Sequence, residues 1–278
     1  MDIESKKFLG QPKNFVSIFN ALLFDGQPVL KSEYLKDENS ELVMNVSSKH
    51  VDIIKRYEDG TYLDLFVIES QSYVDPSMVA RVMEYESVAR MRYIRQNFKK
   101  HVPMHTRLPM ILTVVLYVGE SKWNAAKRLS ELEIIHPGFE DMFNEFKLNL
   151  IELNTNHKYN TGEKATQDFF DLLRMIYRKQ VLKEDLDREF NRDALYFAYV
   201  VTKNKELLNI YQKSEKGDVK VCRALDEMFE ESTNKGIQMG IKQGIERGIE
   251  QGIERGEKNT QIKIAIKMLV RNNQTLEE

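Results

Sequence analysis

Two neighbouring apolar stretches carry polar side chains that could do chemistry. The first stretch contains an acid, and the second ends with an acid and an amide two residues apart. Asp52 lies in the first stretch, residues 50–57, whereas Glu69 and Gln71 end the second, residues 62–71. Both stretches are rich in residue types that favour β-strands. Carboxylates are the ligands that Mg²⁺ and Mn²⁺ prefer, and such an ion polarises a phosphodiester and lowers the pKa of bound water. These residues are therefore candidates for a divalent metal site.

The turn between the two stretches decides whether these side chains meet. A two-residue turn at Asp59-Gly60, the strongest short hairpin signal, sets Asp52 opposite Val67. Opposite residues share a sheet face, as do residues two apart on a strand, so Glu69 and Gln71 are predicted on the Asp52 face. Glu69 is then the diagonal neighbour of Asp52, at about 7–8 Å between Cα atoms, which lets two carboxylates hold one cation. A three-residue loop would reverse this parity.

The same acids have a simpler interpretation. They can be strand-end carboxylates that pair with Lys49, Lys55 or Arg81. The metal site would instead add the Ser70 carbonyl as a further oxygen ligand. The spacing alone favours the ion pairs, so the metal hypothesis depends on further signals.

The composition bounds the class of protein. The 278 residues suffice for one large domain or two small ones. The net charge of −2 argues against a generally basic nucleic-acid-binding surface but leaves room for a local basic groove. Cys222 is the only cysteine, which excludes an intramolecular disulfide. Residues 1–7 are polar and charged, and no apolar run reaches the roughly 18 residues of a membrane helix, so we expect a soluble, cytoplasmic protein.

Apolar periodicity and turn signals order the elements around the candidate site. They predict a helix capped by Asn14, a short strand near residues 42–46, and a helix from Ser77 to about Phe98. A strand follows at residues 110–119, apolar on both faces as a covered central strand should be. Residues 146–153 read as a further strand, and residues 163–230 as helical with a break at Gly217.

The end of the chain is a low-complexity repeat. From Gly236 to Gly256 a glycine recurs at every fourth residue, each followed as far as Ile253 by an isoleucine. Each glycine costs a helix about 1 kcal/mol relative to alanine. The stripe is either a self-association element that packs helices closely or a solvated, partly ordered helix.

Two linked motifs resemble a known family. Asp52…Glu69-x-Gln71 is followed by DPSMVARVMEY at residues 75–85. Together they look like the recombination-promoting nuclease / putative transposase family of the PD-(D/E)XK nuclease superfamily. Further matching stretches are FVSIFNALLFDGQPVL, LPMILTVVLYVGESKWN, FKLNLIEL and the Gly-Ile-Glu-Arg tail, so that the resemblance covers most of residues 10–256.

The resemblance implies a fold and an activity. The fold is α/β, with a PD-(D/E)XK restriction-endonuclease-like core at residues 10–160, an αβββαβ mixed sheet flanked by helices. A helical extension at 161–230 and the repeat tail at 231–278 would follow. The implied activity is DNA endonuclease action, with Asp52 and Glu69 as ligands of Mg²⁺ or Mn²⁺.

The residues around this implied metal site have more open roles. Gln71 stands where the superfamily usually carries lysine; it would orient water but supplies no positive charge. Arg81 is either a substitute cation or an ion-pair partner of Glu69 or Glu84. Glu33 or Asp25 would be an additional acid from the region of the first helix.

Partners follow from charge and from the tail. The best basic patch for DNA backbone contact consists of Arg90, Arg92, Arg95, Lys99 and Lys100. The alternative for this patch is an ordinary solvated helix end. The tail would make a homo-oligomer, a dimer in the simplest case. The rival function is a catalytically weak or inactive nuclease-fold protein that binds DNA or self-assembles.

Overall fold

The computed structural model describes residues 3–37, 53–60, 63–98, 100–214 and 217–274. The chain divides into two compact units, residues 1–225 and residues 226–278. Asp52 and the strand expected near residues 42–46 lie outside the described residues.

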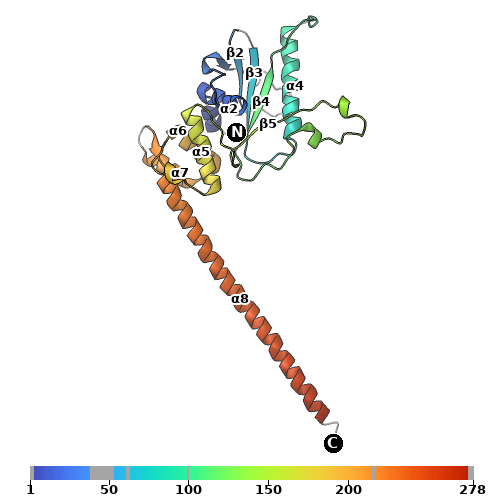
Figure 1. Ribbon diagram of the computed structural model, residues 1–278, viewed down its shortest axis with the longest axis vertical. Helices are drawn as coiled ribbons and strands as arrows, with labels where there is room; N and C mark the ends of the chain where they lie inside the picture. Colours follow the sequence, from blue (N-terminus) through green and yellow to red (C-terminus); the bar gives the residue numbers. More distant parts are fainter. Residues whose placement is uncertain (1–2, 38–52, 61–62, 99, 215–216, 275–278) are drawn as a thin grey trace. The chain divides into compact units, whose positions relative to one another are not determined.

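A five-stranded mixed sheet forms the centre of the first unit (Figure 1). Its strands, in spatial order, are β1 (Leu35–Asp37), β2 (Ile53–Glu58), β3 (Leu63–Gln71), β4 (Ile111–Tyr117) and β5 (Asn149–Glu152). The first two neighbouring pairs are antiparallel, whereas β3–β4 and β4–β5 are parallel. The carboxyl ends of β3, β4 and β5 therefore meet at one edge of the sheet.

The β2–β3 register differs from the expected one. Ile54 pairs with Val67 and Glu58 with Leu63, so residues 59–62 separate the paired strands and the two-residue turn was wrong. Because the shift amounts to two residues, it preserves which residues share a face. Glu69 therefore still lies on the face of Val67 and Ile54.

Helix α4 (Met78–Asn97) covers this face of the sheet and runs opposite in direction to β3 and β4. Tyr85 and Ala89 of α4 cluster with Ile111 at the start of β4, whereas Met78 clusters with Tyr117 at its end. The amino end of α4 thus lies at the carboxyl edge of the sheet. The helix predicted from Ser77 to about Phe98 is thereby confirmed.

Helix α2 (Pro12–Phe24) packs on the opposite face, where Phe19 stacks on Phe66 with ring centroids 4.9 Å apart. The helix begins two residues before Asn14, the predicted cap, with proline in its first turn. Asn14 is buried instead, and its side-chain amide donates to the Phe8 carbonyl of α1 (Ile3–Leu9). With α2 and α4 on its two faces, β4 is buried as predicted for a central strand.

The first unit ends in a small helical layer. Its elements are α5 (Lys164–Arg178), α6 (Arg192–Thr202), α7 (Lys205–Lys213) and a two-stranded ladder of β6 (Glu189–Phe190) and β7 (Val219–Lys220). Single turns of 3-10 helix occur at Ser32–Tyr34 (η1), Leu129–Glu131 (η2), Glu140–Met142 (η3) and Lys183–Asp185 (η4). The purely helical pattern expected for residues 163–230 missed the ladder, whose strands are too short to show a period of two.

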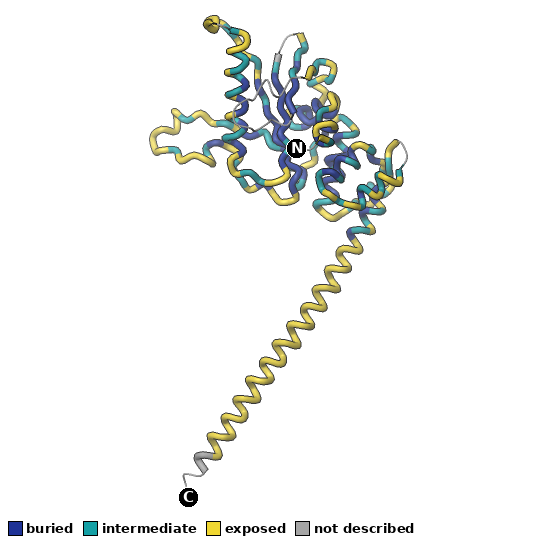
Figure 2. The backbone as a smooth tube through the Cα atoms, turned by 180° about the vertical axis from the view of Figure 1, so that it is seen from behind, coloured by how far each residue is buried: buried dark blue, intermediate teal, exposed yellow. Residues whose placement is uncertain are grey.

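The repeat tail is helical throughout its described length. Helix α8 spans Cys222–Gln274, and Figure 2 shows most of it exposed. The isoleucines that follow the repeat glycines are each 55–58% exposed, and they are Ile237, Ile241, Ile245, Ile249 and Ile253. Among the described residues, no helix combines the length and apolar character needed to span a membrane.

Candidate functional site at the carboxyl edge of the sheet

Glu69 and Gln71 end β3 with their side chains buried on the α4 side of the sheet, 4% and 5% exposed. The parallel register places Gln71 level with Tyr117 of β4, and Tyr117 level with Glu152 of β5. The carboxyl ends of three adjacent strands thus present polar groups on one face. A carboxylate and an amide buried at a strand end require polar partners, because an uncompensated charge there is costly.

Arg81 supplies the partner for Glu69. Its Nη2 atom lies 3.1 Å from Glu69 Oε1, and its Nη1 atom lies 2.5 Å from Asp75 Oδ2. The Tyr85 hydroxyl accepts further hydrogen bonds from Nε at 3.1 Å and from Nη2 at 2.9 Å. Of the two sequence interpretations of Arg81, the ion pair with Glu69 is therefore formed.

The protonation of this cluster follows from its contacts. Burial on its own would lower the pKa of Arg81, but the hydrogen bonds to Asp75 and Tyr85 raise it overall. Burial also opposes ionisation of Asp75, but hydrogen bonds from Ser77 and Arg81 outweigh it and lower the pKa of Asp75. Burial raises the pKa of the Tyr85 phenol, which stays neutral. At neutral pH the cluster therefore contains a charged Arg81 tied to the ionised carboxylate of Asp75.

Glu152 is a further acid at this edge that the sequence analysis did not select. Its Oε2 accepts the Trp123 backbone N–H at 3.3 Å, and its Oε1 forms an ion pair with Lys127. Burial and the charge of Glu152 raise the pKa of the Tyr117 phenol. A signal was available, since an acid closes the apolar run NLIE just as Glu69 closes its own run.

Close contacts join the segments that follow the strands. The Val118 N–H donates to the Gln71 carbonyl at 2.8 Å. The Asn154 side-chain amide donates to the carbonyls of Gly119, at 3.0 Å, and Glu120, at 3.2 Å. A Cβ on Gly119 would lie 2.7 Å from the Ser72 carbonyl oxygen, so only glycine fits between the ends of β3 and β4.

Glu33 is not brought to Glu69. It lies in η1, just before Leu35 of β1. Leu35 pairs with Tyr57 of β2, and Tyr57 pairs with Asp64 at the start of β3. Five residues of β3 separate that level from Glu69, which is roughly 17 Å at 3.3 Å per residue. Glu33 lines a separate cavity of about 270 Å³.

The expected basic patch also lies away from Glu69. Arg90 is paired with Glu86 at 2.8 Å, and Glu86 in turn accepts the Thr113 N–H. Arg92 and Arg95 lie on the last turns of α4, and Lys100 is exposed beyond it. Arg92 comes eleven residues after Arg81, roughly 16 Å along the helix axis and toward the amino edge of the sheet. Lys99 lies outside the described residues.

The oxygen donors at the carboxyl edge are of the type that binds a divalent metal ion. Within the part of the chain that the structure describes, no three His, Cys, Asp or Glu side chains gather closely enough to form a complete site. Asp52, the expected second ligand, lies outside the described residues. Glu69 fits a hard cation by its chemistry, because carboxylate oxygens are the ligands that Mg²⁺ prefers and one carboxylate has about four lone-pair positions.

Comparisons with known proteins place the chain in a family. No curated protein and no solved structure matches it. One family model does match, over residues 6–207, and this span contains the sheet, α4 and the whole carboxyl edge. Since the match covers well over half of the chain, the protein belongs to the family described as putative transposase, YhgA-like.

Proposed function

We propose that the protein is a metal-dependent DNA endonuclease with little sequence preference, linked to recombination or to mobile elements. The family description, a YhgA-like transposase, supports a DNA-related role. The observation that carries the proposal is the buried carboxylate of Glu69 at the carboxyl edge of the sheet, held by Arg81. Ligands of open α/β sheets characteristically bind at this edge.

Each residue of the proposed site has a distinct role. Asp52, Glu69 and the Ser70 carbonyl would hold Mg²⁺ or Mn²⁺, which when bound activates water and offsets phosphate charge. Gln71 ends the strand on the Glu69 face, where its amide orients water. Arg81 acts as a positioning residue, because its bonds to Glu69, Asp75 and Tyr85 fix the carboxylate that the metal needs.

The alternative is a nuclease-fold protein with weak or no catalysis that serves in DNA binding or assembly. One observation favours it. Arg81, the substitute for the lysine that the superfamily usually carries, is already held by three side chains. Gln71 cannot supply the missing charge, because an amide is neutral.

Plasmid nicking in Mg²⁺ or Mn²⁺ tests the proposal. Wild type should nick, whereas Asp52→Ala and Glu69→Ala, purified identically, should not. Glu84→Ala is the matched control, since Glu84 is an exposed acid on α4. Equal nicking by all four proteins would place the activity elsewhere. Binding of DNA without nicking by wild type would favour the alternative.

We also propose that the tail joins copies of the chain. The repeat isoleucines leave an apolar stripe exposed along α8, which a solvated monomer would not favour. A Cβ atom added at Gly240, Gly244 or Gly248 would have no further atom of the same chain within 4 Å, so the space beside these glycines is open.

The triple variant Gly240→Ala, Gly244→Ala, Gly248→Ala separates the two interpretations of the tail. It should raise the helicity of the tail, because each change from glycine to alanine stabilises a helix by about 1 kcal/mol. It should also lower the mass found by sedimentation equilibrium, because the added methyl groups keep paired helices apart. Glu246→Gln is the control. Higher helicity at unchanged mass would contradict self-association through the glycines.

A further inference from the structure

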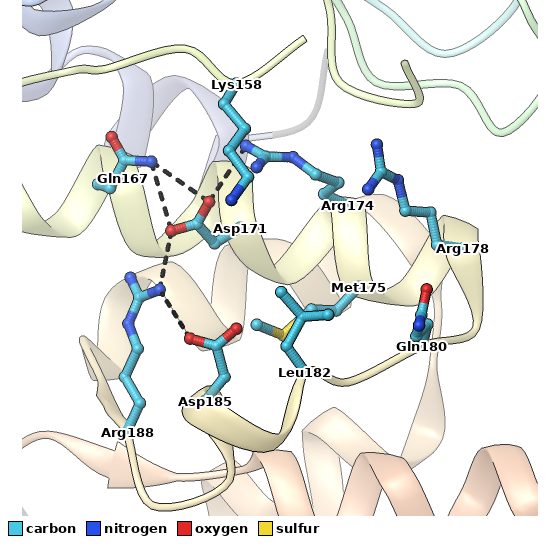
Figure 3. A pocket seen from close by; sticks show the side chains of 10 residues that line it. All are labelled: Lys158, Gln167, Asp171, Arg174, Met175, Arg178, Gln180, Leu182, Asp185 and Arg188. Atoms are coloured by element: carbon cyan, nitrogen blue, oxygen red, sulfur yellow. Dashed lines mark hydrogen bonds and ion pairs between the residues drawn. The ribbon is translucent and has the colours of Figure 1, made fainter. Parts of the chain in front are cut away.

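A pocket of about 210 Å³ opens beside α5 (Figure 3). Its walls come from α5, from the segment that follows β5, and from the segment around η4. The lining residues are Lys158, Gln167, Asp171, Arg174, Met175, Arg178, Gln180, Leu182, Asp185 and Arg188. Four of these side chains are cationic and two are acidic, so the pocket carries an excess of positive charge.

The two acids are largely committed to Arg188. Its Nη1 atom lies 2.9 Å from Asp171 and 3.7 Å from Asp185. Asp171 also accepts two hydrogen bonds at 3.3 Å from Gln167. Little negative charge therefore remains for the other cations of the pocket.

Arg174 is the most buried of these cations, with its residue 8% exposed. Its Nη2 atom is 3.1 Å from Asp171 but makes no hydrogen bond of acceptable geometry with any described residue. Burial lowers the pKa of its guanidinium, and although Asp171 opposes this, the charges of Arg178 and Arg188 lower it further. A buried arginine under these conditions is stabilised by an added anion.

Arg178 and Lys158 complete the cationic wall. Arg178 lies one helical turn after Arg174, and its Nη2 atom donates to the Thr155 carbonyl at 3.0 Å and to Asn156 Oδ1 at 2.7 Å. Both acceptors are neutral, so among the described residues no carboxylate offsets its charge. Lys158 is exposed, and the described residues offer it no ion pair.

We propose that this pocket binds a phosphate group. Two guanidinium groups and an ammonium around a cavity match the several acceptor oxygens of a phosphate, and arginine forks bind such oxygens in pairs. A DNA strand and a free nucleotide both carry this group. The DNA strand is the source that we expect, and this step rests on the proposed nuclease function.

Hydrogen bonds link the pocket to the candidate active site. The Val118 N–H donates a hydrogen bond to the Gln71 carbonyl. The Val118 carbonyl in turn accepts a hydrogen bond from the hydroxyl of Tyr177, the residue directly before Arg178. The carboxyl end of α5 is thus fixed to the carboxyl edge of the sheet.

Inorganic phosphate tests the pocket without DNA. At constant ionic strength, phosphate should raise the melting temperature of the full chain more than chloride does, because ligands that bind the folded state stabilise it. Lys158→Ala and Arg178→Gln should each reduce this rise, and the double variant should abolish it. Lys183→Ala is the control, since Lys183 is exposed in η4 but does not line the pocket. These changes spare buried Arg174, so the fold should survive.

A labelled oligonucleotide identifies the source of the phosphate. Arg178→Gln should weaken DNA binding roughly tenfold, the usual scale for a hydrogen bond to a charged group. Lys158→Ala should reduce the slope of log affinity against log salt by about 0.7–0.9, one phosphate contact. Lys183→Ala should change neither quantity.

The outcomes separate this pocket from the nuclease proposal. Loss of the phosphate effect together with weaker DNA binding supports the site with DNA as its ligand. Loss of the phosphate effect with unchanged DNA binding supports the site with a free nucleotide instead. A phosphate effect that is absent in wild type, or equal in every variant, overturns the proposal. A wild type that never nicks DNA but shows the phosphate effect would contradict only the nuclease.

Discussion

The two edges of the central sheet differ in how they hold their charged groups. At the carboxyl edge, Glu69 and Gln71 are buried, and Arg81 ties Glu69 to the start of α4. At the amino edge, Arg95 is exposed on the last turn of α4, and Glu33 lies at the mouth of a different cavity. Both edges carry acids and bases, but Glu69 is buried and paired with Arg81, whereas Glu33 and Arg95 are exposed.

The difference shows why charge alone is a poor guide to a site. Exposed basic residues at a helix end need no partner, because water solvates them. A buried acid and amide at a strand end are retained only where surrounding contacts compensate them. Restraint is also what catalysis needs, because a reacting group must keep its geometry. The carboxyl edge is therefore the better candidate for chemistry, and the amino edge for contacts that tolerate motion.

The largest expected effect tests this contrast through two matched acid-to-amide changes. Glu69→Gln should lower metal-dependent nicking by roughly 100-fold or more, the scale of losing one charge-stabilising group. Glu33→Gln should leave nicking within about twofold of wild type, because Glu33 lies far from Glu69. Initial rates on supercoiled plasmid measure both. Equal losses in the two variants would remove the distinction between the edges.

A smaller effect is expected on stability at the carboxyl edge. Asp75→Asn removes the ionised partner of Arg81 and should lower the free energy of unfolding by about 1–3 kcal/mol at pH 7. The folded-state pKa of Asp75 is lowered, so its contribution is complete above the unfolded value near 3.9. It is lost as the pH falls from there through the folded pKa.

Urea unfolding at pH 7, 5 and 3 checks this prediction. The difference between wild type and Asp75→Asn should persist at pH 5 and shrink at pH 3. Asp193→Asn, an exposed acid in the first turn of α6, serves as the control for a general charge effect. A difference that grows toward low pH would show that the sign of the Asp75 contribution is wrong.

The smallest effect is expected at the amino edge. The double change Arg92→Ala, Arg95→Ala should weaken DNA binding only about two- to threefold, because charges near a solvated helix end contribute little. The nicking rate at saturating DNA should stay unchanged. Anisotropy titrations and single-turnover nicking measure the two quantities. A large fall in the single-turnover rate would place the α4 patch at the reacting phosphate after all.

The sequence predicted the central strands and helix α4 better than the way they are arranged. Strand β3, the burial of β4 on both faces and helix α4 were predicted correctly, because runs of apolar residues and the Asp-Pro-Ser start are strong local signals. The family resemblance is confirmed over residues 6–207. The Glu69–Arg81 ion pair was one of two stated alternatives.

Prediction from the sequence was weakest for features that depend on strand register or on contacts between residues far apart in the chain. The Asp-Gly turn signal gave a hairpin register that is two residues off, since a longer connection also satisfies the alternation of faces. Glu33 and the α4 patch were selected by residue type, with no means to see that α4 runs toward the amino edge. The pocket beside α5 needs Lys158, Arg174 and Arg178 together, and three separated cations form no local pattern.

The contact between the first helices and the last layer of the unit affects how the protein is made. Phe8 of α1 stacks on Phe197 of α6, and Ser17 of α2 bonds to Thr166 of α5 at 2.7 Å. At synthesis rates of 5–20 residues per second, roughly 8–30 s separate the emergence of Ser17 from that of Thr166. For that interval the residues of α1 and α2 that contact α5 and α6, such as Phe8, lack their final partners, so chaperones can bind them before the unit closes.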